Sequence, residues 1–294
     1  MAKNTKAFLI IVFIISFILK ILRVELNLIN LPILILSSLI PIVFFFLIKE
    51  IDQKSEKLAF ISTILLTLNP YNIYFSDITL KTNFFLFLLL LMMWLVSKYF
   101  HIKNNKFLLP ILIIIPLIFN LIFIDNNSGL YPQDQHRTQT IINETNSLDY
   151  YIFYNPIQLF LRNFTIRYLN YFSPEFLIFG NTFANPRHGT ILYPSIIFLI
   201  LGIFISFSSK KKQKINLIFL IWLLIAPISA ALSPELINSN KAFFMSIPLV
   251  YFISIGIYFI LNKYKNKLVY FSIIFIYLLS LIYYLDMYLN HFIK

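Results

Sequence analysis

An acidic and a basic residue lie four positions apart between two strongly apolar stretches, in 68-LNPYNIYFSDITLKTNFFLFLLLL-91. Asp77 and Lys81 at this spacing share one face of a helix and can form an ion pair. A carboxylate at the rim of a membrane segment is costly to place there and can act as a general base. Asp77 is therefore a candidate catalytic base and Lys81 a candidate substrate ligand, with a simple local ion pair as the alternative.

Four other places carry charges next to apolar stretches. Glu25 is a second candidate acid in 23-RVELNLIN-30, where it can also pair locally with Arg23. Cationic candidates for an anionic substrate are Arg187 and His188 in 184-ANPRHGTILYP-194, Lys241 at the end of 233-SPELINSNK-241, and Arg162. Arginine suits phosphate because its planar fork binds two oxygens at once, and free N–H groups at a helix start add to such a site. A plain loop without a ligand role is the alternative for 184–194.

Metal and nucleotide chemistry find little support in the sequence. Asp134 and His136 form only a weak ligand pair, and no zinc-binding spacing is present, so we expect no metal site. The chain has no cysteine, which excludes disulfides and thiolate ligands. With only five glycines it has no glycine-rich phosphate loop, which argues against a nucleotide-hydrolysing transporter or a kinase.

The composition places these residues in a membrane protein. Of the 294 residues 59% are hydrophobic and 12% charged, whereas a soluble domain is about a quarter charged. Apolar runs long enough to cross a bilayer recur throughout the chain. We expect an all-α polytopic bundle forming a single membrane domain over 1–294, with nine transmembrane helices near 7–22, 31–48, 57–75, 83–100, 107–124, 191–208, 215–233, 242–262 and 267–285.

The positive-inside rule orients this bundle. Placing the N-terminus in the cytoplasm puts short lysine-bearing loops on the cytoplasmic side and the C-terminus outside. The net charge of +12 is then explained by topology and not by binding to nucleic acid. Every arginine falls on the outer side, at Arg23, Arg137, Arg162, Arg167 and Arg187. Any chemistry is therefore expected at the outer face of the cell membrane.

A large outer loop, about 125–190, is too long for a simple connector. Within it, Asn155 and Pro156 predict the start of a helix. Apolar and aromatic residues then recur at helical spacing, at Ile157, Phe160, Leu161, Phe164, Tyr168 and Phe172. Such a helix is expected either to lie at the membrane interface or to pack as a cap over the bundle.

Three stretches together resemble the GT-C type of membrane glycosyltransferases, which includes the protein mannosyltransferases and the bacterial aminoarabinose transferases. The first is 68-LNPYNIYFSDITLKTNFFLFLLLL-91, with its Asn-Pro and Tyr-x-Ser pattern. The second, 168-YLNYFSPEFLIFGNTFANPRHGTILYP-194, is similar to an outer loop of bacterial members, and the third, 222-WLLIAPISAALSPELINSNKAFFMSIPLV-250, to a late span and loop.

The resemblance implies transfer of a sugar from a polyprenyl-phosphate-linked donor to an acceptor at the outer membrane face. It implies a carboxylate as the catalytic base, for which Asp77 is the first candidate and Glu25 the second. It also implies cationic ligands for the donor phosphate, with Arg187, His188, Lys241 and Arg162 as candidates, and a divalent cation is an alternative. The chain departs from the family in two places. Its first outer loop is short, with Glu25 as its one acid, and Asp77 stands where the family often has arginine.

Two other classes of function stay open. A non-catalytic scaffold subunit, or a degenerate relative, predicts that no outer acid faces a cavity. A lipid or solute transporter predicts charged residues deep in the membrane and an inverted repeat. We expect the interiors of the spans to lack acids and bases, which argues against an ion-coupled transporter. The sugar, the acceptor and the oligomeric state do not follow from the sequence.

Overall fold

The computed structural model describes residues 3–21, 30–52, 55–78, 80–100, 108–122, 156–180, 189–208, 213–233 and 238–291. Every regular element in these ranges is a helix. The first half contains α1 (Lys3–Ile21), α2 (Asn30–Ile51), α3 (Glu56–Thr67), α4 (Pro70–Ile78), α5 (Leu80–Phe100) and α6 (Leu108–Ile122). The second half contains α9 (Pro156–Asn170), η1 (Glu175–Phe179), α10 (Ser195–Ser208), α11 (Gln213–Ile225), α12 (Ile228–Ala231), α13 (Ser239–Ala242), η3 (Phe243–Met245), α14 (Ser246–Tyr264), α15 (Lys267–Asp286) and η4 (Met287–His291).

Six segments of the described chain are long and apolar enough to cross a membrane: Asn4–Ile21, Leu31–Ile51, Thr82–Tyr99, Gln213–Ala231, Ser239–Tyr264 and Lys267–Asn290. Two shorter apolar helices, Pro110–Ile122 and Ser195–Ser208, accompany them. The prediction of an all-helical membrane protein is therefore confirmed. The span expected at 57–75 is divided into α3, with 12 residues, and α4, with 9 residues.

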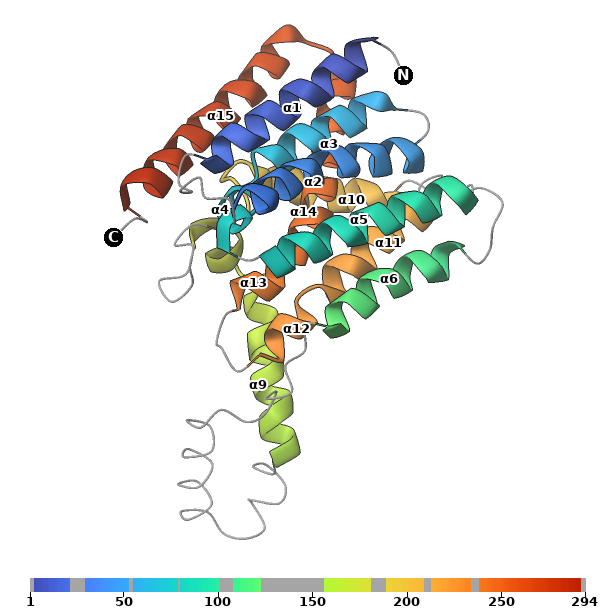
Figure 1. The fold of residues 1–294 in the computed structure, drawn as a ribbon, viewed down its shortest axis with the longest axis vertical. Helices are drawn as coiled ribbons and strands as arrows, with labels where there is room; N and C mark the ends of the chain where they lie inside the picture. The colour runs from blue at the N-terminus through green and yellow to red at the C-terminus, as the bar shows by residue number, and fades with distance from the viewer. Residues whose placement is uncertain are drawn as a thin grey trace.

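The helices alternate in direction, so the bundle has two chemically different ends (Figure 1). One end, which we call the lysine-rich end, holds Lys49 of α2, Lys98 of α5, Lys214 of α11 and Lys263 of α14. The ammonium groups of three of these lysines lie near aromatic rings: the Lys98 Nζ atom is 5.4 Å from the ring centre of Trp94, and Lys49 and Lys263 make similar contacts. Lysines arranged in this way keep their stems on apolar surface while the ammonium groups reach toward water.

Helix α14 lies at the centre of the bundle and packs against α3, α10 and α11. Its crossing with α10 is very close, because two glycines face each other there. A Cβ atom added to Gly202 would lie 1.8 Å from the backbone oxygen of Phe252, and one added to Gly256 would lie 2.1 Å from that of Phe198. Small residues at such crossings let two membrane helices approach through their backbones.

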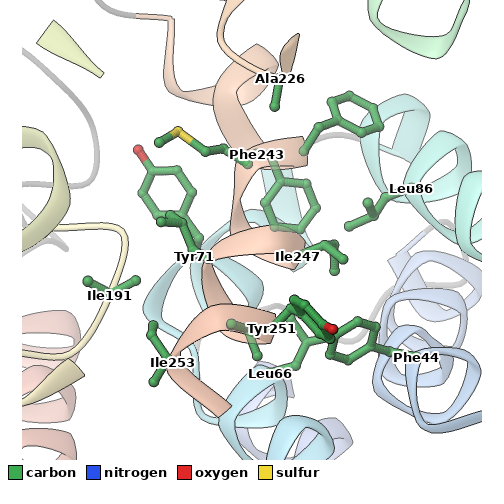
Figure 2. Close-up of a cluster of buried hydrophobic side chains, with 14 of the residues drawn as sticks. Phe44, Leu66, Tyr71, Leu86, Ile191, Ala226, Phe243, Ile247, Tyr251 and Ile253 are labelled. Carbon is green, nitrogen blue, oxygen red and sulfur yellow. The ribbon is translucent and has the colours of Figure 1, made fainter. Parts of the chain in front are cut away.

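Aromatic and aliphatic side chains surround α14 (Figure 2). The ring of Tyr251 stacks on Phe219 of α11 at 3.8 Å between centroids. The Tyr251 hydroxyl donates to Asn216 Oδ1 over 2.8 Å, so the polar end of this buried side chain is satisfied. On the other side of the bundle Phe8, Phe45 and Phe60 bring together α1, α2 and α3 through ring contacts of 4.4–6.1 Å.

Several buried hydroxyl groups donate to carbonyls of their own helices. Thr63 and Thr67 donate to the carbonyls four residues earlier, at Ala59 and Thr63, over 2.7 and 2.8 Å. Ser206 and Ser254 donate in the same way to Gly202 and Val250. The membrane interior contains no water to bind these hydroxyl groups. Leaving a polar group unpaired in hydrocarbon costs several kcal/mol, of order the transfer values for amides and hydroxyls, and these hydrogen bonds avoid that cost.

Replacing Gly256 with alanine should destabilise the protein, by about 1–3 kcal/mol, because the new methyl group must push α10 and α14 apart. In an uncrowded helix, replacing glycine with alanine has the opposite effect and stabilises the protein by up to about 1 kcal/mol. Thermal or denaturant unfolding in detergent measures the difference. Ile200→Ala, at a side chain of α10 that is 65% exposed, is the control. A Gly256→Ala protein as stable as the wild type would contradict the close crossing.

Candidate functional site

The Asn-Pro motif forms the break between α3 and α4. Pro70 is the first residue of α4, where its missing N–H group costs no hydrogen bond. Asn69 Oδ1 accepts from the backbone N–H of Asn72 over 3.2 Å, which caps the new helix. The amide of Asn72 donates back to the Leu66 carbonyl at the end of α3 over 3.0 Å. The motif therefore ends one helix and starts the next, and its two amides pair backbone groups that the break leaves free.

The same asparagine joins α4 to the segment in which the long loop returns to the bundle. Asn69 Nδ2 donates to the backbone oxygen of Thr190 over 3.0 Å. Thr190 N–H in turn donates to Phe176 O of η1 over 3.2 Å. A Cβ atom on the neighbouring Gly189 would lie 2.4 Å from the backbone of Ile178, so this approach requires a glycine. Two sequence segments more than a hundred residues apart thus meet here.

The stretch before α14 completes the junction. The Tyr171 hydroxyl accepts from the backbone N–H of Asn238 over 2.8 Å. The ring of Phe176 lies edge-on to both Tyr171 and Tyr71, with centroids at 4.9 and 5.9 Å. Asn238 Oδ1 caps α13 by accepting from Lys241 N–H over 3.0 Å. We call the meeting point of residues 69–72, 171–180, 189–191, 233 and 238–241 the three-segment junction; in Figure 1 α13 lies between α4 and α12.

Two cationic side chains converge on Ser233 within this junction. Lys241 is buried, with Nζ 3.5 Å from Ser233 Oγ, and Arg167 Nη1 donates to the Ser233 backbone oxygen over 3.1 Å. Asn238 Nδ2 also donates to Ser233 Oγ, over 3.2 Å. Positive charge concentrated in a partly dehydrated site attracts anions more strongly than the same charge does in water. The chemistry that the arrangement supports is binding of a phosphate or carboxylate.

Helix α9 carries Arg167 to the junction. In Figure 1 it projects beyond the bundle, with its later part beside α12. Aromatic rings run along one side of it, with Phe160 stacked on Phe164 and Phe164 on Tyr168 at 6.4 and 5.9 Å. The Tyr168 hydroxyl donates to Leu224 O over 2.9 Å, and burial raises its pKa. The hydroxyl therefore stays protonated at neutral pH and keeps this anchor to the end of α11.

The structure describes part of the predicted site. Asp77 lies in the last turn of α4 and Lys81 in the first turn of α5, so both belong to helices at the end of the bundle that contains the junction. Lys241 lies in the junction itself, whereas the side chain of Arg162 is exposed on α9. Glu25, Arg187 and His188 lie outside the described residues, as do Asp134 and His136.

Lys20, which the sequence analysis gave no role, lies at the end of the first predicted span. This side chain is completely buried in the last turn of α1, and its Nζ atom donates to the Ser37 backbone oxygen over 2.7 Å. Lys20 falls inside the span predicted at 7–22, so its position in the sequence was the available signal. Arg167 was also not predicted as a site residue. It lies five positions after Arg162 and therefore on a different face of the same helix, which is the signal that the sequence offered.

Within the described ranges, no group of three His, Asp or Glu side chains is arranged to hold a metal ion. The search for related proteins gave no match among family models, curated proteins or solved structures. The similarity to GT-C enzymes therefore stays a prediction that rests on the three quoted stretches.

Tyr171→Phe should lower the free energy of unfolding by about 1–3 kcal/mol, because it leaves the buried Asn238 N–H without its acceptor. Differential scanning fluorimetry in detergent reports the change. Tyr264→Phe removes a hydroxyl from a tyrosine that is 56% exposed and serves as the matched control. Equal melting temperatures for the two variants would show that the Tyr171–Asn238 bond contributes nothing to the junction.

Proposed function

We propose that this protein is a membrane-embedded glycosyltransferase that moves a sugar from a polyprenyl-phosphate-linked donor to an acceptor. The observation that carries the proposal is the three-segment junction. The three stretches that resemble GT-C enzymes are far apart in the sequence, yet each supplies hydrogen-bonded residues to this one place: Asn69 and Asn72, Tyr171 and Thr190, and Ser233, Asn238 and Lys241.

The donor phosphate would bind where the cations converge. Lys241 and Arg167 both reach Ser233, one through its hydroxyl and the other through its carbonyl. When the bond between the anomeric carbon and the phosphate oxygen breaks, the leaving polyprenyl phosphate gains negative charge. Fixed cations at that position stabilise the charge as it develops, which is how such groups accelerate transfer reactions. Arg187 and His188 remain further candidates for this role.

The acceptor would be activated by a carboxylate. Asp77 lies in the last turn of α4, roughly 10 Å along the helix axis from Pro70 at a rise of 1.5 Å per residue. It would accept the proton of the attacking hydroxyl group while that oxygen forms the new bond to the anomeric carbon. Glu25 is the second candidate for the base, and Lys81, four residues after Asp77, would orient the carboxylate or the substrate.

The lipid tail of the donor requires an apolar approach to the junction. Helix α9 presents Phe160, Phe164 and Tyr168 in a continuous row that ends beside Arg167. Aromatic side chains of this kind favour the boundary between headgroups and hydrocarbon. The proposal includes nine spans in the cell membrane, a cytoplasmic N-terminus, and the junction and C-terminus on the outer side, as the lysine distribution favours. Arg162 would meet lipid headgroups farther out on α9.

Lys241→Ala should weaken binding of a polyprenyl monophosphate by about 10–100-fold, since a charge-assisted hydrogen bond to phosphate contributes about 1.5–3 kcal/mol. Binding is measured by titrating the lipid into the purified chain in nanodiscs. Lys241→Arg should restore part of the affinity, and Lys98→Ala, at the lysine-rich end, should leave it unchanged. Saturable binding that is identical in wild type and Lys241→Ala would exclude the junction as the phosphate site.

Asp77→Asn should reduce sugar transfer by about 100-fold or more while donor binding persists, because loss of a general base acts on the reaction step. The assay follows consumption of a radiolabelled polyprenyl-phosphate sugar by membranes containing the protein. Normal transfer by Asp77→Asn would exclude Asp77 as the general base, and Glu25→Gln would then be the variant to test. Donor binding with no turnover by the wild type would favour a non-catalytic lipid-phosphate-binding protein, and no donor binding at all would favour a scaffold.

A further inference from the structure

A cavity of about 290 Å³ opens at the lysine-rich end between α10, α11 and α14. Its volume is close to the lower limit for sites that hold a small molecule. The lining consists of Ser206, Phe207, Gln213, Lys214, Asn216, Leu217, Leu220 and Phe252. The polar residues Gln213 and Lys214 are exposed at the start of α11, whereas Phe252, which lines the cavity from α14, is 1% exposed. The cavity therefore changes from cationic and polar at its mouth to apolar inside.

The polar groups inside the cavity already have partners. Asn216 Nδ2 donates to Ser206 O over 3.0 Å, and Asn216 Oδ1 accepts from the Tyr251 hydroxyl over 2.8 Å. Ser206 Oγ donates to Gly202 O over 2.7 Å. A hydrophilic solute would lose hydration on entry without gaining free donors or acceptors from these residues. Hydrocarbon loses nothing there, because the remaining wall is leucine and phenylalanine.

The mouth offers the opposite chemistry. Lys214 lies in the first turn of α11, where the first backbone N–H groups of the helix have no partner within it. A lysine beside the end of a membrane helix favours anionic phospholipids, and basic pockets between helices bind their phosphate headgroups. The charge and the apolar wall together match one molecule with an anionic head and a hydrocarbon tail.

We propose that this cavity binds an anionic phospholipid of the bilayer, with the phosphodiester at Lys214 and the start of α11, and an acyl chain against Leu217, Leu220 and Phe252. The site is separate from the three-segment junction. Helix α11 begins at the cavity and ends at Ile225, about 18 Å farther along the axis for 13 residues, on the side where Tyr168 and Ser233 lie. The inference does not depend on the proposed transferase activity.

Native mass spectrometry of the purified full chain tests this site with two lipids that share acyl chains, dioleoyl phosphatidylglycerol and dioleoyl phosphatidylcholine. We expect the wild type to retain the anionic lipid at least fivefold better than the zwitterionic one. Lys214→Ala should reduce that retention by about fivefold, since one lysine near a membrane surface contributes about a factor of five. Lys263→Ala, at the same end but away from the cavity, is the charge-matched control.

A second pair of measurements separates the acyl chain from the headgroup. Leu220→Trp should fill the cavity and abolish retention of the anionic lipid, and Leu217→Trp, at a position 41% exposed, should do the same with little effect on folding. Glycerol 3-phosphate in excess should not displace the lipid. Equal retention of the two lipids, unchanged retention in both tryptophan variants that fold, or displacement by glycerol 3-phosphate would each overturn the proposal.

Discussion

The backbone contact between α10 and α14 at Gly202 and Gly256 helps to position the end of the bundle that holds the three-segment junction. Because α10 lies directly on α14, its first residue, Ser195, reaches α15 and shares a hydrogen bond of 2.9 Å with Tyr277. The chain just before Ser195 is thereby held beside α4, where the Thr190 carbonyl meets Asn69. A wider crossing would move this segment away from α4. The geometry of the junction therefore depends in part on two glycines located some distance from it.

Asparagine amides hold the helix ends together in a medium that supplies no water. Asn69 and Asn72 pair the ends of α3 and α4, and Asn120 does the same for the end of α11: its Nδ2 donates to Ala226 O over 2.8 Å and its Oδ1 accepts from Ser229 N–H over 3.0 Å. An amide can both donate and accept, so one side chain satisfies two backbone groups left over where a helix breaks. Short irregular segments are tolerated at membrane depth only when their backbone N–H and C=O groups are hydrogen-bonded in this way.

Patterns of neighbouring residues in the sequence predict the helices well but do not predict which residues meet at the junction. Long apolar runs predict membrane-spanning helices. Asn69 and Pro70 predict a helix break, because helix capping and proline geometry depend on neighbouring residues in the sequence. The meeting of Thr190 with Asn69 and of Tyr171 with Asn238 depends on packing between distant segments, for which one sequence offers no local signal. Lys20 shows the same limit: its charge sits at the end of a long apolar run, and only the packing of α1 on α2 reveals that Ser37 O lies within reach. Arg162 and Arg167 differ by five residues, which is enough to leave one exposed and turn the other toward Ser233.

The two ends of the bundle use positive charge differently, and burial is the reason. At the lysine-rich end Lys98, Lys214 and Lys263 are exposed, so water and salt screen the attraction of each ammonium group for anions. At the junction Lys241 is buried and Arg167 half-buried, and both are held in fixed positions by Ser233 and Asn238. A charge held in a site of lower dielectric interacts more strongly and needs little reorganisation when an anion forms beside it. Exposed lysine suffices for topology, whereas departure of a lipid phosphate in the proposed reaction would require a buried charge that is held in place.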